Sequence, residues 1–102
     1  MATGSLDKEI TRRIVSQHMN EVKFCYDQEL VRKPSLAGRV SVQFAIAPNG
    51  RVLTSVLQST SMNEPRVESC VVNAVRRWEF PKPEGGGMAI VVYPFSFTSP
   101  SS

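Results

Sequence analysis

The sequence predicts an α+β domain in which a three-stranded antiparallel sheet, with strand order 2-1-3, has two helices packed on one face. Two segments, 7–31 and 65–78, repeat apolar residues at the helical period, and three others, 39–46, 51–59 and 88–97, are strand-like. A tight-turn sequence joins the first two strands, which makes them antiparallel. The second helix returns the chain, so the third strand is antiparallel to the first. The element order is therefore α-β-β-α-β.

Length and composition indicate one small domain. The chain has 102 residues, of which 41% are apolar and 21% charged, and its net charge is +3. These values are ordinary for a globular protein with one modest core. We expect a flexible segment at 1–6, the domain at 7–97 and a disordered tail at 98–102. Because the sequence has no run of about 20 apolar residues and no signal segment, we also expect a domain excised from a longer protein.

The first predicted helix, from Asp7 to Val31, has one broad apolar face. Ser5 or Asp7 is expected to cap its start, and Pro34 ends it. Phe24 lies on the polar side, as an exposed aromatic or as a partner contact. The apolar face is formed by Ile10, Ile14, Val15, His18, Met19, Val22, Cys25, Tyr26 and Leu30.

Catalytic chemistry has little support in this sequence. His18 is the only histidine, and it lies in the middle of the apolar face, which is typical of a structural residue. No second titratable group is spaced to act with it, and no paired carboxylates mark a pocket. We therefore expect no enzyme activity, no catalytic residues, no metal site and no cofactor.

The first two strands form a hairpin. The first alternates cleanly, with Val40, Val42, Phe44 and Ile46 on one face. The turn at 47–51 contains proline, asparagine and glycine, the residues that tight turns require. The return strand is less regular, so either it contains a bulge or its outer face is partly apolar.

The second helix ends in an aromatic corner. Its apolar stripe runs through Val67, Val71 or Cys70, Ala74 and Trp78. Asn63 or Glu64 lies near its cap, and Pro65 is in its first turn. Pro81 and Pro83 lack the amide donor, so the helix ends near Trp78 or Glu79. We expect Trp78 and Phe80 to be structural anchors of the core at this corner.

The third strand, 88–97, lies at an edge of the predicted sheet and contains Pro94, which an edge strand tolerates. Natural edges are usually protected by charge, but this strand carries none. An uncharged edge suggests a docking surface for another strand. The alternatives are that Pro94 and the tail protect the edge sufficiently, or that the domain dimerises there.

Two cysteines, Cys25 and Cys70, lie on the apolar sides of the two predicted helices. The sequence alone leaves two interpretations open, a disulfide or two buried thiols. A disulfide would close a segment of about 45 residues and contribute about 4 kcal/mol in the chain-entropy model. It would also indicate an oxidising compartment.

Several motifs carry a resemblance to a known family. The helix closing in Trp78-Glu79-Phe80-Pro81-Lys82-Pro83 and the last strand with Tyr93-Pro94-Phe95-Ser96-Phe97 resemble the C-terminal periplasmic domain of the TonB family. Phe24-Cys25-Tyr26 and Glu68-Ser69-Cys70-Val71 narrow the resemblance to the AgmX/PglI C-terminal type, found in gliding-motility proteins of myxobacteria and their relatives. The resemblance covers about residues 5–97.

The resemblance implies a periplasmic module of a protein anchored in the inner membrane, which transmits force or energy from an ion-driven motor. It implies a disulfide between Cys25 and Cys70. The partner would be an extended segment of an outer-membrane or periplasmic protein, paired with the last strand. That docking edge would be formed by Ile90, Val91, Val92, Tyr93, Pro94, Phe95, Ser96 and Phe97, with Tyr93, Phe95 and Phe97 supplying side-chain selectivity.

The sequence departs from the family in carrying neither the transmembrane helix nor the proline-rich spacer, so we expect the motor to connect through a missing N-terminal part. Two other function classes are alternatives. The edge could serve self-association, as a dimer or by strand exchange. Nucleic-acid binding is disfavoured, because the arginines form pairs on helix surfaces and no long basic run.

Overall fold

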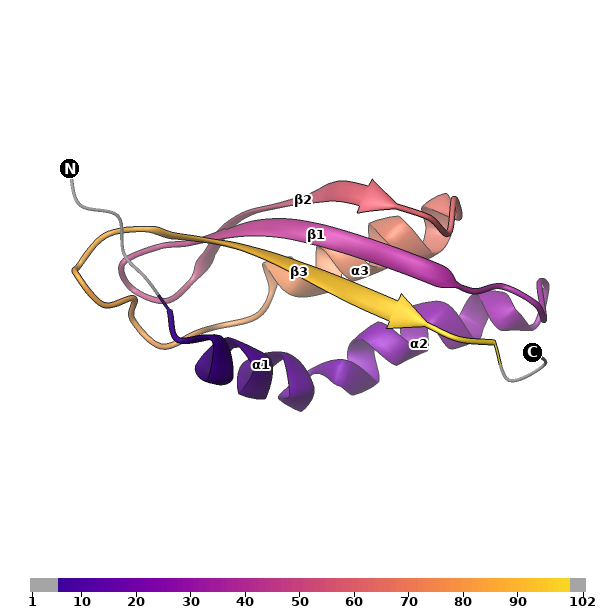
Figure 1. Ribbon diagram of the computed structural model, residues 1–102, viewed down its shortest axis with the longest axis horizontal. Coiled ribbons are helices and arrows are strands. Elements are labelled where there is room, and N and C mark those ends of the chain that lie inside the picture. The colour runs from indigo at the N-terminus through magenta and orange to yellow at the C-terminus, as the bar shows by residue number, and fades with distance from the viewer. Residues whose placement is uncertain (1–5, 100–102) are drawn as a thin grey trace.

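The computed structural model describes residues 6–99, so the sequence predictions for residues 1–5 and 100–102 lie outside the described part. The elements are α1 (Lys8–Gln17), α2 (Met19–Leu30), β1 (Gly38–Ile46), β2 (Val52–Thr60), α3 (Pro65–Arg76) and β3 (Ala89–Phe97) (Figure 1). The strands form a β2-β1-β3 sheet in which β1 is antiparallel to both neighbours. The predicted strand order and fold class are confirmed.

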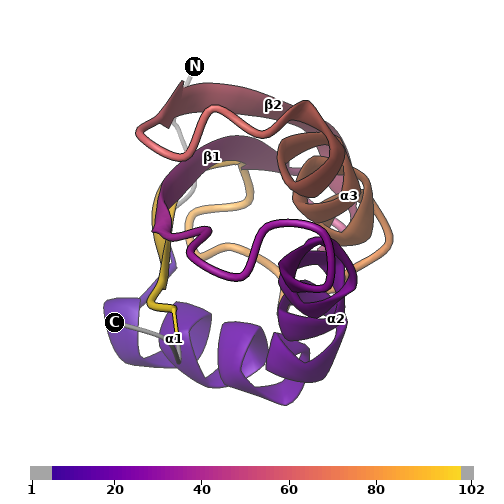
Figure 2. The ribbon, with the colours of Figure 1, turned by 90° about the vertical axis from the view of Figure 1, so that its right-hand side faces the viewer.

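The helices α2 and α3 cover one face of the sheet, and the core lies between them and β1 (Figure 2). Val40, Val42, Phe44 and Ile46 of β1 are fully buried there, as their alternation predicts. Within residues 6–99, no helix has the length and apolar character that crossing a bilayer requires.

The β1–β2 ladder is irregular, and both explanations that the sequence left open apply. The pairing register shifts between Ser41 and Val42 and again between Ala45 and Ile46. Leu53 and Val56 of β2 are also exposed. A bulge increases the local twist, which bends β2 relative to β1.

The single long helix predicted at 7–31 is wrong, because the helix breaks at His18. The backbone there has φ −107° and ψ 6°, outside the helical region, and α2 begins at the next residue. The imidazole of His18 stacks on the indole of Trp78, with ring centroids 4.8 Å apart. The bend takes α1 off the helix layer, so it runs beside β3 (Figures 1 and 2). Ile10 and Met19, expected on the apolar face, are consequently exposed.

The corner after α3 is fastened to the β1–β2 turn. The amide of Phe80 donates to the carbonyl of Gly50 at 2.8 Å, and the ring of Phe80 stacks on Phe44. Gly50 has φ +91°, and a Cβ there would lie 2.1 Å from the carbonyl oxygen of Phe80. This position therefore requires glycine. The contact holds the chain after Trp78 against the sheet.

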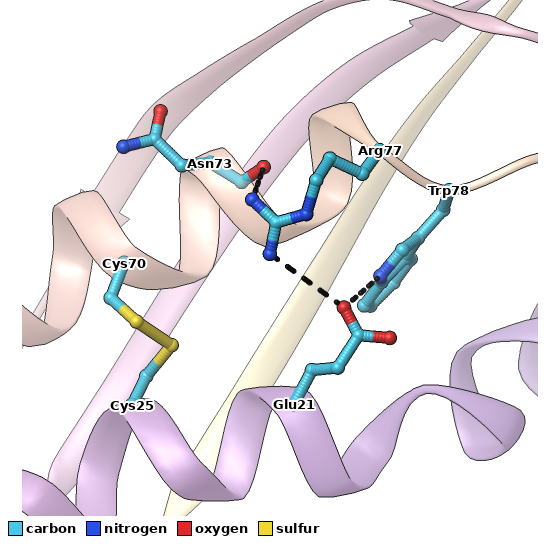
Figure 3. Close-up of a disulfide and its surroundings, with 6 residues drawn as sticks. All are labelled: Glu21, Cys25, Cys70, Asn73, Arg77 and Trp78. Carbon is cyan, nitrogen blue, oxygen red and sulfur yellow. Dashed lines mark hydrogen bonds and ion pairs between the residues drawn. A yellow bond between two sulfur atoms is a disulfide. The ribbon is translucent and has the colours of Figure 1, made fainter.

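A disulfide joins Cys25 of α2 to Cys70 of α3 (Figure 3), with the two Cα atoms 5.6 Å apart. Cys25 is buried and Cys70 is half-buried, so the bond lies at the outer side of the helix layer. It links the two helices that cover the sheet.

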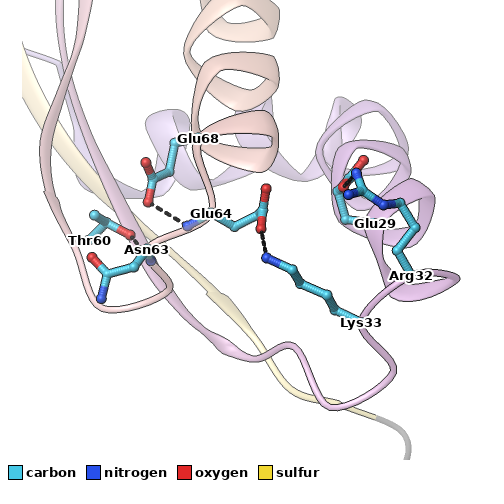
Figure 4. A network of polar contacts seen from close by, with 7 residues as sticks. All are labelled: Glu29, Arg32, Lys33, Thr60, Asn63, Glu64 and Glu68. Atoms are coloured by element: carbon cyan, nitrogen blue, oxygen red, sulfur yellow. Dashed lines mark hydrogen bonds and ion pairs between the residues drawn. The ribbon is translucent and has the colours of Figure 1, made fainter.

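The start of α3 is fixed by a polar network at the far end of the helix layer (Figure 4). The ammonium group of Lys33 contacts the carboxylate of Glu64, the residue that precedes α3. Glu68 accepts a hydrogen bond from the amide of Glu64 at 3.1 Å, so a side chain of the helix binds the backbone of the N-cap residue. The hydrogen bond from Lys33 lowers the pKa of Glu64 below its ordinary value and outweighs the opposing effect of burial.

Acid is expected to destabilise this domain through such carboxylates. Because the pKa of Glu64 is lower in the folded chain than the unfolded value of about 4.3, the unfolded state binds protons first as the pH falls. The contribution of Glu64 is therefore present above that value and is lost as the pH falls through the folded pKa. Chemical denaturation at pH values between 7 and 3 should show a shallower acid loss for Glu64→Gln than for the wild type. The exposed Glu84→Gln is the control, and equal slopes for all three proteins would contradict the assignment.

Candidate functional site: the outer edge of β3

The register of the sheet shows which backbone groups of β3 are unpaired. The amide of Ser61 donates to the carbonyl of Arg39 at 2.9 Å, so the backbone N–H and C=O groups of odd-numbered β1 residues point toward β2. The backbone groups of even-numbered β1 residues therefore point toward β3, because neighbouring residues of a strand direct these groups to opposite sides. Val40 and Val42 lie opposite Phe95 and Tyr93, so the odd-numbered residues of β3 make the bonds to β1.

The outer edge of β3 consequently presents the backbone groups of Ile90, Val92, Pro94 and Ser96. Three of these residues carry an N–H, and all four carry a carbonyl. Pro94 lacks the donor at an outward position, so it removes no bond to β1. Within residues 6–99, β1 is the one strand that pairs with β3. We call this row the docking edge.

The side chains of β3 divide by the same alternation. Ile90 and Val92 are 55% and 45% exposed on the open face of the sheet, while Val91 and Tyr93 are half-buried on the helix side. Each of the four is apolar or aromatic. The β3 side chains at the docking edge are thus uncharged on both faces of the sheet.

The prediction that Phe95 and Phe97 supply selectivity to a partner is not supported, because their exposed fractions are 2% and 8%. Phe95 packs edge-on against Trp78 with a centroid distance of 6.2 Å. Phe97 stacks on Tyr26 at 4.9 Å. Both rings fasten β3 to the helix layer. Their odd numbers place them among the residues bonded to β1, so neither their side chains nor their backbone groups reach the docking edge.

Two grooves lie beside β3, one near each end of the strand. The first has a volume of about 360 Å³ and is lined by Leu6, Lys8, Thr11 and Arg12 together with 90–93. The second has a volume of about 250 Å³ and is lined by Met19, Asn20, Lys23 and Tyr26 together with 96–98. The first groove exists because the chain bends at His18 and takes α1 past the edge of the sheet. The sequence did not predict that α1 lies there, since a straight helix would place its residues elsewhere.

A cluster of polar contacts stabilises the bend at His18. The Nδ1 atom of His18 lies 2.7 Å from a carboxylate oxygen of Glu21. The indole N–H of Trp78 donates to the other oxygen at 3.4 Å (Figure 3). Burial raises the pKa of Glu21, but these hydrogen bonds, with the nearby charges of His18 and Arg77, outweigh it and leave the pKa lowered. Trp78 itself is 2% exposed. The cluster therefore connects the bend, the end of α3 and the inner side of β3.

The described residues do not gather in the way a metal site requires. Residues 6–99 contain no group of three or more His, Cys, Asp or Glu side chains placed to hold an ion. Cys25 and Cys70 are bonded to each other, so neither offers a thiolate. What the geometry offers is a strand edge with unpaired backbone groups between two grooves.

Comparison with known proteins gives one structural relationship. No protein-family model and no curated protein matches this sequence. The fold is similar to the solution structure of the TonB C-terminal domain of Helicobacter pylori, with a TM-score of 0.51 and 14% sequence identity. The alignment covers 96% of this chain and 95% of that domain. At this identity the similarity shows a TonB C-terminal-like fold.

Proposed function

We propose that this chain is a non-enzymatic periplasmic adaptor that binds an extended segment of an outer-membrane or periplasmic partner along the docking edge. The observation that carries this proposal is the row of unpaired backbone groups at Ile90, Val92 and Ser96, on a strand without charge. An added strand would satisfy these groups by β-augmentation. The TonB C-terminal-like fold supports the same mode, because the sequence resemblance to that family implies pairing on the last strand.

The proposal extends to force transmission from an inner-membrane motor, in gliding motility. Nine consecutive residues of β3 pair with β1, the central strand of the sheet. A partner strand bound along β3 would therefore pull on many hydrogen bonds at once. The disulfide between α2 and α3 holds together the helix layer that supports the sheet. The AgmX/PglI type and the periplasmic location rest on the sequence resemblance and remain part of the proposal.

A proline at position 92 tests the docking edge. Val92→Pro removes an outward N–H without removing a bond to β1, so the fold is kept and an added strand loses a donor. We expect affinity for a partner peptide to fall at least tenfold, since a lost hydrogen bond and the clash of the ring act together. The probe is a ten-residue peptide selected from a random library on the folded, oxidised domain. Affinity is measured by isothermal titration calorimetry.

The matched control for this variant is Leu57→Pro. Leu57 lies opposite Val42, so its N–H points to the outer edge of β2 by the same register argument. It is expected to bind the peptide like the wild type. If Val92→Pro is folded by circular dichroism and binds with unchanged affinity, the docking edge does not receive the peptide.

A second copy of this chain is the competing occupant of the same edge. Exposed Ile90 and Val92, with unpaired backbone groups and no charge, would suit antiparallel pairing of β3 with β3 about a two-fold axis. Sedimentation equilibrium separates the alternatives. A mass that rises with concentration and falls for Val92→Pro would favour self-association over peptide docking.

A further inference from the structure

The charged helix residues that line the two grooves beside the docking edge are all basic: Lys8, Arg12 and Lys23. We infer that the extended partner carries acidic side chains on the face it turns toward α1 and α2, and apolar side chains on its other face. This inference rests on the proposed docking at β3 and specifies the chemistry of its partner. It is carried by the residues that line the two grooves.

The lining of the grooves contains cations and no anion. Lys8 and Arg12 lie in the first groove, and Lys23 lies in the second. Aspartate and glutamate are absent from the residues that line either groove, and strand residues 90–97 are uncharged. A segment bound between β3 and the helices would therefore meet positive charge at both ends.

The charges are available to a ligand. Arg12 contacts Glu9 at 3.1 Å, but both side chains are largely exposed, at 65% and 73%, and Glu9 lies outside the groove lining. Exposed pairs of this kind contribute little and exchange readily. Lys8 of α1 and Lys23 of α2 are both exposed. An incoming carboxylate would compete with one weak pair and otherwise with water.

The spacing of the grooves sets the pattern expected in the partner. The first groove lies beside 90–93 and the second beside 96–98. About six strand residues span this separation, or roughly 20 Å. Side chains alternate along a strand, so positions an even number apart share a face. The acidic residues are therefore expected near the two ends of the bound segment, at even spacing.

The open face of the sheet sets the other half of the pattern. On this face Ile90 lies opposite Ala45 and Val92 lies opposite Gln43, so the neighbours of both residues across the ladder are uncharged. An added strand would extend this face with every second side chain. Apolar residues there would pack beside the exposed side chains of Ile90 and Val92, whereas a charge would lose hydration beside them.

Three synthetic ten-residue peptides test the inference, each alternating valine with glutamate, glutamine or lysine. Alternation puts all charged side chains of a peptide on one face, so each peptide can turn either face to the helices. Amide NMR titrations of the oxidised domain locate binding and give dissociation constants. We expect shifts at 90–97 and an affinity about tenfold higher for the glutamate peptide than for the lysine peptide, because several exposed charge pairs each contribute modestly. Raising the salt concentration should reduce the difference.

Charge reversal supplies the matched comparison. The double variant Lys8→Glu with Arg12→Glu should prefer the lysine peptide. Arg13→Glu with Lys82→Glu changes the net charge equally at exposed positions outside both grooves, and it should retain the wild-type preference.

The outcomes distinguish this inference from the proposed function. Equal binding of all three peptides, with shifts at 90–97, would contradict the charge inference and leave docking at β3 intact. A preference for glutamate that both double variants lose equally would show a net-charge effect and also contradict it. If none of the three peptides perturbs residues 90–97, the docking edge itself is refuted, and the inference falls with it.

Discussion

Replacing Cys25 and Cys70 by serine is expected to lower the free energy of unfolding by about 4 kcal/mol. The bond closes a segment with a sequence separation of 45 residues. A cross-link of this length removes that much chain entropy from the unfolded state in the loop-closure model. Small domains typically have total stabilities of about 5–15 kcal/mol, so the loss is a large share. Urea denaturation of the oxidised wild type and of the double variant measures it.

Reduction of the wild type by dithiothreitol should cause a similar loss, and the same reagent should leave the double variant unchanged. The loss also bears on function, because α2 and α3 are joined by this bond and α3 ends at the Trp78 corner. Equal stabilities of the oxidised wild type and the double variant would show that the bond does not constrain the unfolded chain.

Trp78→Ala is expected to cost about 3–5 kcal/mol, the range for removing a large buried aromatic side chain. The indole is 2% exposed and lies between the imidazole of His18 and the ring of Phe95. Its loss would leave a cavity between the bend of the helices and the inner side of β3. Thermal and urea unfolding measure the cost.

Trp78→Phe is the graded control, because it keeps an aromatic ring and removes the N–H that donates to Glu21. We expect a smaller loss than for alanine, since part of the packing is kept. If Trp78→Ala costs less than 1 kcal/mol, the indole does not support the bend and β3 as described.

Much of the fold followed from local chemistry. The alternation of Val40, Val42, Phe44 and Ile46 predicted a buried central strand, and these side chains are fully buried. The order of the elements predicted that the third strand, which contains Pro94, lies at an edge, and β3 is at the edge of the sheet. The alternation and the order of the elements can both be read along the chain. Such signals survive without knowledge of the tertiary structure.

The break at His18 could not be predicted in this way. Residues 8–30 contain neither proline nor glycine, the usual causes of a kink. The bend coincides with contacts to Trp78, which lies far along the chain. The first groove depends on the bend, so the positions of Lys8 and Arg12 beside β3 could not be predicted, for the same reason.

The sequence also could not show which side chains of the third strand pack against the helices. Apolar residues occur at both parities of 89–97, with Ile90 and Val92 on one face and Val91 and Tyr93 on the other. Periodicity alone therefore cannot decide which set packs on the helices. The register with β1 decides it, and it buries Phe95 and Phe97.

Amide hydrogen exchange in β3 tests the docking edge most directly, with and without the selected peptide. In the free domain, the amides of Ile90, Val92 and Ser96 should exchange quickly, while those of Val91, Tyr93 and Phe95, bonded to β1, exchange slowly. Bound peptide should slow the even-numbered amides of the wild type, and the effect should be lost in Val92→Pro. If the peptide binds and the even-numbered amides still exchange at their free rates, the partner does not pair with β3.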